Sequence, residues 1–199
     1  MPVLMGGCVP RYGVSSARDE FLGTSEVRMH GDVLGNPDHG SEWIELNAVV
    51  RRRQGEPPAY ALQVRYRDSD EWLRIPPGES LIVLADSQRI RLDGFGSRAN
   101  RRTHFGLGVE EVASYAASAD VLRSIARAER VRLRIIGSRD YVEREFTPEN
   151  RARFRQFVDT QVDGKKVALP AADTAHASWL KRWWRWLRRT NPRSPPQRE

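Results

Sequence analysis

The chain has 199 residues, 39% of them hydrophobic, and a single cysteine. This length suffices for one domain whose core needs neither disulfides nor metal. A mean hydropathy of −0.62 excludes a polytopic membrane protein. The formal charge of +7 suggests an anionic partner, but it is unevenly placed. Residues 1–164 hold 24 arginines against 24 acidic residues, whereas residues 165–199 hold nine basic residues against two acidic ones. The body is therefore neutral and the tail carries the charge.

The chain begins with a short apolar stretch, Met1-Pro2-Val3-Leu4, followed by Met5-Gly6-Gly7 and Cys8. This stretch resembles the lipobox, the end of a bacterial lipoprotein signal, in which a Leu-like residue and two small residues precede a cysteine. The resemblance implies that Cys8 is lipidated, and Val9 after it implies an outer-membrane destination. Seven residues do not hold a complete signal, so a lipoprotein would start upstream of Met1. The alternative is a free cysteine in a disordered leader.

The first half of the chain predicts short strands. Residues 1–24 indicate a leader or tether, because residues 9–24 show no sustained period. After it, apolar residues recur at every second position in several runs separated by Gly and Pro, which is typical of antiparallel strands. The expected strands are 25–33, 44–50, 60–67, 71–75, 81–85 and 89–92. Their order predicts a meander, in which each strand pairs with the next.

The second half adds helices. Residues 94–108 indicate a long loop, and 109–117 favours a strand over a helix. Ser118 is placed to cap a helix through residue 129, and Thr147-Pro148-Glu149 predicts the start of another that ends near residue 163. Between them, 131–135 and 141–146 predict a hairpin in which Glu143 and Glu145 lie opposite Arg132 and Arg134. Residues 25–164 therefore predict a single α+β domain, a mostly antiparallel sheet with two helices in its second half.

The tail predicts a linker over 165–177, an amphipathic helix over 178–190 and a disordered end over 191–199. The helix holds Trp179, Leu180, Lys181, Arg182, Trp183, Trp184, Arg185, Trp186, Leu187, Arg188 and Arg189. At about 100° per residue, its apolar residues occupy an arc of roughly 160° and its cations the opposite arc. Eleven residues rise about 16 Å, which is too short to span a bilayer. We therefore expect it to lie on an anionic membrane surface. The alternatives are packing on the protein's own sheet or on a partner protein, and binding to nucleic acid, against which the neutral body argues.

Two further clusters are candidate sites. Arg98, Arg101 and Arg102 lie in the long loop, where they form a possible anion contact on an otherwise mobile surface loop. The only His/Asp cluster is His30 and Asp32 with Asp38 and His39, whose spacing matches no zinc or calcium signature. We expect a plain strand connection there and no metal. No catalytic motif occurs, so the sequence predicts neither enzymatic activity nor a cofactor, although an enzyme with a cleft invisible in one sequence remains an alternative.

Together these features predict a bacterial envelope protein with a non-catalytic binding or scaffolding domain. Lipidated Cys8, the Trp/Arg helix or both would hold it at a membrane, with the periplasmic face of the outer membrane favoured. Its expected partners are an anionic membrane surface and, as an open possibility, an envelope protein. The alternative is a cytosolic protein whose tail binds nucleic acid or an acidic partner.

Overall fold

The computed structural model describes residues 12–35, 42–104 and 108–165, which form one ten-stranded sheet and two α-helices. The strands are β1 (Gly13–Asp19), β2 (Thr24–His30), β3 (Trp43–Arg53), β4 (Ala59–Asp68), β5 (Gly78–Ala85), β6 (Gln88–Gly94), β7 (Arg101–His104), β8 (Gly108–Ala117), β9 (Val131–Ile136) and β10 (Tyr141–Glu145). The helices are α1 (Ala119–Arg127) and α2 (Pro148–Phe157), and a π-helical turn, η2 (Val158–Val162), extends α2. Mostly antiparallel pairing with two helices in the second half confirms the α+β prediction, while the predicted C-terminal helix lies outside the described residues.

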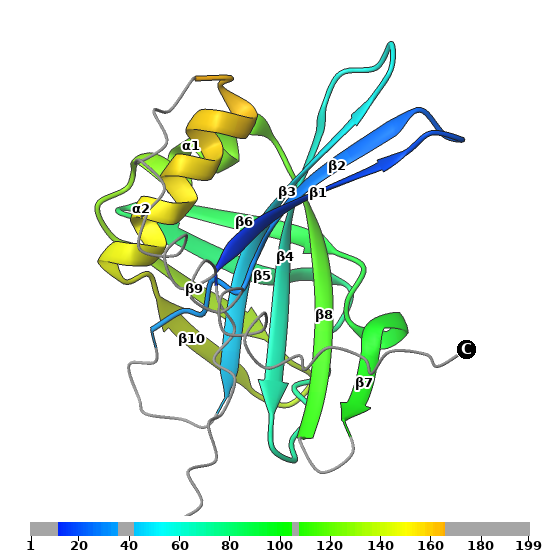
Figure 1. The fold of residues 1–199 in the computed structure, drawn as a ribbon. Coiled ribbons are helices and arrows are strands. Elements are labelled where there is room, and N and C mark those ends of the chain that lie inside the picture. The colour runs from blue at the N-terminus through cyan, green and yellow to red at the C-terminus, as the bar shows by residue number, and fades with distance from the viewer. Residues whose placement is uncertain (1–11, 36–41, 105–107, 166–199) are drawn as a thin grey trace, which may run out of the picture. The chain divides into compact units, whose positions relative to one another are not determined.

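The sheet closes on itself (Figure 1). Its strand order is β1-β2-β3-β4-β8-β6-β5-β9-β10, with β7 beside β8. Residues 33–35 then join β3 to β10, because Val33 bridges Glu45 in β3 and Gly35 bridges Glu145 in β10. We call residues 33–35 the closing segment. The closed ring therefore contains β3, β4, β8, β6, β5, β9 and β10. Strands β1 and β2 extend the sheet beyond β3.

The meander prediction is correct only in part. Strands β1 to β4 pair in chain order, as do β5 with β6 and β9 with β10. However, β4 pairs with β8 over nine residue positions, so β8 lies between β4 and β6. This insertion joins strands that are distant in the chain, which local alternation does not encode.

Three local predictions were wrong. Residues 13–19 form β1 instead of a tether, and their lack of period has a simple cause: six of the seven face solvent, so neither face needs apolar residues. Residues 71–75 form no strand, because Arg74 takes a left-handed conformation with φ 55°. The loop predicted over 94–108 contains β7, a short strand paired with β8.

The helices begin where the sequence predicted. The Ser118 side chain accepts a hydrogen bond from the Val121 amide at 3.2 Å, which caps α1. Thr147 caps α2 and forms a reciprocal capping box with Asn150, while Pro148 occupies the first helical turn. Such caps satisfy amides that a helix leaves without partners. The helix starts are therefore encoded locally.

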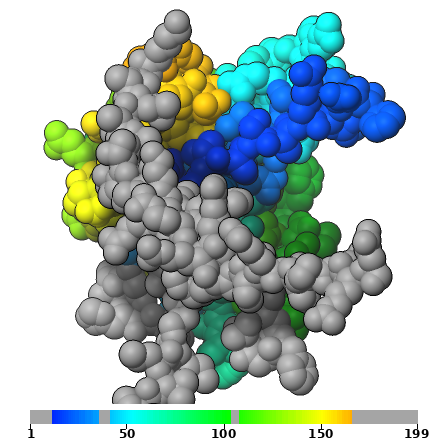
Figure 2. Space-filling view, in the orientation of Figure 1, coloured from blue at the N-terminus to red at the C-terminus, as the bar shows by residue number. Residues whose placement is uncertain are grey.

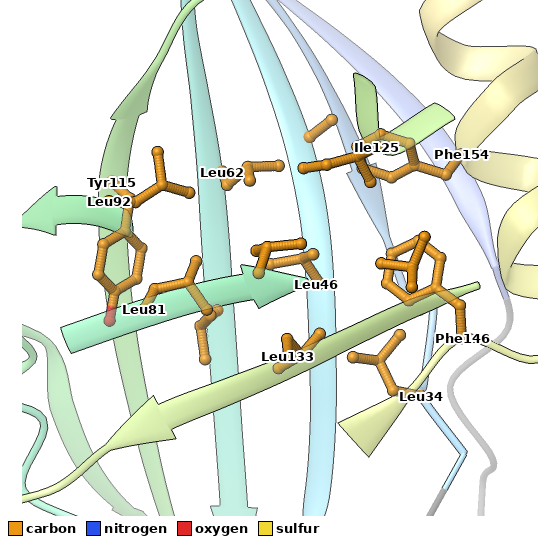
Figure 3. Packing of buried hydrophobic residues seen from close by; sticks show 14 of the residues in the cluster. Leu34, Leu46, Leu62, Leu81, Leu92, Tyr115, Ile125, Leu133, Phe146 and Phe154 are labelled. Carbon is orange, nitrogen blue, oxygen red and sulfur yellow. The ribbon is translucent and has the colours of Figure 1, made fainter. Parts of the chain in front are cut away.

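The interior of the closed sheet is filled by apolar side chains. Figure 3 shows Leu46, Leu62, Leu81, Leu133 and Tyr115 pointing inward from five strands of the sheet. The helices contribute their buried sides, which hold Leu122, Ile125, Ala126, Phe154 and Phe157. These residues belong to one continuous core.

The closing segment is held by a buried polar cluster. The Asn150 amide donates to the Asp32 carboxylate at 2.9 Å and to the Val33 carbonyl at 3.0 Å, so α2 is bonded directly to this part of the chain. Arg153 also donates to Asp32, at 3.2 Å. Asp32 is fully buried, and this desolvation raises the pKa of its carboxyl despite the opposing effects of Asn150 and Arg153.

A second buried carboxylate, Glu111, fixes the irregular residues that follow β4. It accepts hydrogen bonds from the Arg74 amide at 2.7 Å and the Ile75 amide at 3.2 Å. The Ser97 hydroxyl and the Arg101 guanidinium, at 3.3 Å, complete its shell. The Arg74 and Ile75 amides therefore bond to a side chain instead of a neighbouring strand, which explains why residues 71–75 do not join the sheet.

Candidate anion-binding face

The described residues place only part of the predicted sites. Cys8, Asp38, His39 and the Trp/Arg segment 179–189 lie outside them, so those predictions stay predictions. His30 is exposed at the end of β2, whereas Asp32 is buried against α2. In the part of the chain that the structure describes, no three His, Cys, Asp or Glu side chains gather as metal ligands.

The three arginines predicted as an anion contact differ in their surroundings. Arg98 lies in a short 3₁₀ turn and is exposed, as is Arg102 in β7. Arg101 is half-buried, and its guanidinium contacts the Glu111 carboxylate and the Ser97 hydroxyl. Because Arg101 already neutralises a buried carboxylate, it is poorly placed to bind an additional anion.

A larger set of arginines gathers on the outer face of β6, β5, β9 and β10. Alternation along each strand turns Leu81 and Val83 inward, so Ile82 and Leu84 face outward. In the strand register, Ile82 lies between Arg91 and Arg134, and Leu84 lies between Arg89 and Arg132. Arg130, just before β9, borders the same hollow, whose volume is about 680 Å³. We call this surface the arginine face; it comprises Ile82, Leu84, Arg89, Arg91, Arg130, Arg132 and Arg134.

Three of these arginines are paired with carboxylates. Arg91 contacts Glu79 at 3.2 Å, and Arg130 forms two hydrogen bonds with Glu145, at 2.9 and 3.1 Å. Arg134 contacts Glu143 and also lies 4.3 Å from the centre of the Tyr141 ring. The Arg130 guanidinium lowers the pKa of the Glu145 carboxyl, so this pair stays ionised at neutral pH.

The predicted cross-strand register of this hairpin is confirmed. Glu143 lies opposite Arg134, and Glu145 lies opposite Arg132. The first pair forms the expected ion pair, whereas Glu145 turns to Arg130 instead. Arg132 therefore forms no ion pair with Glu145, although its charge still helps to lower the pKa of that carboxyl.

Arg89 and Arg132 are the free cations of the arginine face. Both side chains are exposed, and neither forms an ion pair with any carboxylate in the described residues. They flank Leu84 on the two strands beside β5, so their Cα atoms are about 10 Å apart, which is twice the spacing between strands. Guanidinium groups bind phosphate and carboxylate oxygens through paired N–H donors. This arrangement suits a surface that presents several anionic groups.

The sequence contains a signal for the arginine face, but this signal is divided between two separate stretches of the chain. Arginine occupies alternate positions in two stretches, Arg89 with Arg91 and Arg130 with Arg132 and Arg134. Each stretch alone predicts only a solvated strand face. The pairing of both β6 and β9 with β5 brings them together, and that pairing is not written in either stretch.

Comparisons with protein-family models, with curated proteins and with solved structures found no match. Among residues 12–35, 42–104 and 108–165, no helix is both long and apolar enough to cross a bilayer.

Proposed function

We propose that this protein is a non-catalytic binding or scaffolding domain of the bacterial envelope that works at an anionic membrane surface. Lipidated Cys8, the Trp/Arg segment 179–189, or both attach it there, with the periplasmic face of the outer membrane as the favoured site. The arginine face supplies a second contact with anionic groups. The observation that carries this proposal is the pair of free cations, Arg89 and Arg132, on an exposed sheet surface.

Charge and shape both support this role. The face holds five arginines against Glu79, Glu143 and Glu145, which leaves an excess of two positive charges. Half-buried Ile82 and Leu84 form an apolar strip between the arginine rows. A basic surface with an apolar centre favours a lipid headgroup layer, where each added cation contributes about 1 kcal/mol of attraction.

Vesicle flotation of the full chain tests the proposal. With vesicles containing phosphatidylglycerol, we expect the chain to float, and with pure phosphatidylcholine we expect much weaker flotation. Replacing both free cations, in Arg89→Gln/Arg132→Gln, removes about 2 kcal/mol of attraction, which corresponds to a roughly thirtyfold lower partition coefficient. A chain ending at Gly164 measures the contribution of the tail separately.

A matched control removes the same charge elsewhere. Arg127 and Arg139 are exposed and form no ion pair with a described carboxylate, and neither borders the hollow. Arg127→Gln/Arg139→Gln should therefore float like the unaltered chain. Equal losses of flotation in the two double variants would mean that net charge, and not the arginine face, drives vesicle binding. Absence of flotation for the full chain would refute the membrane role. A salt-dependent gel shift with nucleic acid that disappears in the chain ending at Gly164, or in Arg89→Gln/Arg132→Gln, would favour nucleic acid as the partner.

A further inference from the structure

Two hairpin ends project from the sheet and form what we call the arm, residues 17–26 and 51–59. Figure 2 shows the blue end of the β1–β2 hairpin and the cyan end of the β3–β4 hairpin standing out together, away from the helices in yellow and orange. At the tip of the first hairpin, the Phe21 side chain is fully exposed and Leu22 is 59% exposed. The two side chains form a small exposed apolar patch at the tip.

The tip is rigid. The Asp19 carboxylate accepts a hydrogen bond from the Leu22 amide at 3.1 Å, and Gly23 takes the left-handed conformation that closes the turn, with φ 60°. The Gly23 carbonyl in turn accepts from the Gln54 amide at 3.3 Å, which ties this turn to the neighbouring hairpin. Hydrogen bonds therefore fix the backbone of the turn that carries Phe21, so this backbone loses little conformational entropy on binding.

The same arm contains a groove of about 680 Å³ between the two hairpin ends. Ala17, Leu22, Pro57 and Ala59 give it apolar walls. Its rim is largely paired, since Arg51 contacts Glu26 at 2.8 Å and Arg53 contacts Glu56 at 3.3 Å. A single aromatic ring fits such a space, and its apolar walls match the side chain that the tip presents.

Two charges in the arm have no partner. Arg18 and Glu20 are both exposed, and neither forms an ion pair or a side-chain hydrogen bond in the described part of the chain. They flank the tip, Arg18 at the groove and Glu20 beside Phe21. The groove thus offers apolar walls and a free cation, whereas the tip offers an apolar ring and a free carboxylate.

We propose that the arm is a homodimerisation surface, in which Phe21 of each chain enters the groove of a second copy. The contact is reciprocal, as a two-fold axis requires, and it places Glu20 of each copy near Arg18 of the other. The outer edge of β1 has no strand partner in the described sheet, and two such edges related by a two-fold axis run antiparallel. The Asp19 and Glu20 carboxylates argue against insertion of this tip into anionic lipid, because like charges repel.

Sedimentation equilibrium of the full chain, without lipid, tests this proposal independently of the membrane role. The contact area is small, so we expect a monomer–dimer equilibrium with a dissociation constant in roughly the micromolar range. Phe21→Ser should weaken it at least about tenfold. The matched control is Phe95→Ser, since Phe95 is 89% exposed in a different loop and should leave the dissociation constant unchanged.

A charge exchange tests the orientation. Arg18→Glu and Glu20→Arg should each weaken the dimer, because each creates a pair of like charges across the interface, and the double variant should restore it. A chain that stays monomeric at all concentrations, or a dimer that tolerates Phe21→Ser, overturns the proposal. Lower vesicle flotation of Phe21→Ser with an unchanged monomer–dimer equilibrium also overturns it, in favour of lipid contact.

Discussion

The Asn150 amide of α2 donates a 2.9 Å hydrogen bond to the Asp32 carboxylate, which lies 118 residues earlier in the chain. The same amide nitrogen donates to the Val33 carbonyl, and the Asn150 side-chain oxygen completes the cap of α2. One side chain therefore joins a helix start to the segment that closes the sheet. Because the junction contains the carboxyl of Asp32, its contribution to the free energy of unfolding should depend on pH.

Asp32→Asn should reduce the pH dependence of unfolding. Burial raises the pKa of the Asp32 carboxyl above its ordinary value of 3.8, so the folded state binds this proton more tightly than the unfolded state. The stabilisation from a protonated Asp32 is present at acidic pH and is lost as pH rises through the folded pKa. Unfolding in urea at pH 3.5 and pH 7 measures this: relative to Asp32→Asn, the unaltered chain should be less stable at pH 7 than at pH 3.5. A constant difference between the two proteins would show that Asp32 does not titrate as the burial implies.

Glu111→Ala should destabilise the fold strongly. The substitution leaves the Arg74 and Ile75 amides and the Arg101 guanidinium without their shared acceptor, and such a loss typically costs about 3–5 kcal/mol. Glu111→Gln retains one acceptor oxygen and should cost less. Urea unfolding measures the free energies, and hydrogen exchange should accelerate first at Arg74 and Ile75. Glu56→Ala, which breaks an exposed ion pair, serves as the control and should change stability by under about 1 kcal/mol.

Leu84→Glu should place a carboxylate between Arg89 and Arg132. Because neither cation is held in an ion pair, the new cross-strand pairs should offset the loss of a half-buried leucine and keep the melting temperature near its original value. The same substitution should abolish the contribution of the arginine face to vesicle binding. Ile82→Glu is the matched comparison: its neighbours Arg91 and Arg134 already hold Glu79 and Glu143, so it should lower the melting temperature more. Equal melting temperatures for the two variants would mean that Arg89 and Arg132 are not available as free cations.

Tyr115→Phe should reduce the loss of folding stability at alkaline pH. Burial raises the pKa of the Tyr115 phenol to about 12, whereas an unfolded tyrosine ionises near 10. Between these values only the unfolded state releases the proton, so stability falls as pH rises from about 10 to 12, by at most about 3 kcal/mol. At neutral pH the variant should lose only the hydrogen bond to Ser80, worth about 1 kcal/mol. Urea unfolding at pH 7 and pH 11.5 compares the two proteins, and parallel losses in both would contradict the assignment to Tyr115.

Features set by neighbouring residues were predictable from the sequence, and features set by distant pairing were not. The caps at Ser118 and Thr147 depend on the next three residues, and the Glu143–Arg134 register depends on one short turn. By contrast, the position of β8 depends on nine pairings with a strand that ends about forty residues earlier.

The same distinction explains why Arg101 was predicted as an anion contact and the arginine face was not. Arg101 looked available in the predicted loop because its partner, Glu111, lies ten residues later, in a strand that the loop itself pairs with through β7. Arg89 and Arg132 looked ordinary because each belongs to a separate alternating strand. Only their common neighbour, Leu84, makes them one surface.

The closing segment also constrains when the molecule can finish folding. Val33 pairs with the nearby β3, but Gly35 must wait for Glu145 of β10, which is synthesised much later. At synthesis rates of about 5–20 residues per second, that interval is on the order of ten seconds. During that time β3 and β4 can form a hairpin, yet their ring stays open with its apolar side exposed. A chaperone that binds exposed apolar surface would meet the chain in that interval, before α2 bonds to Asp32 and the ring closes.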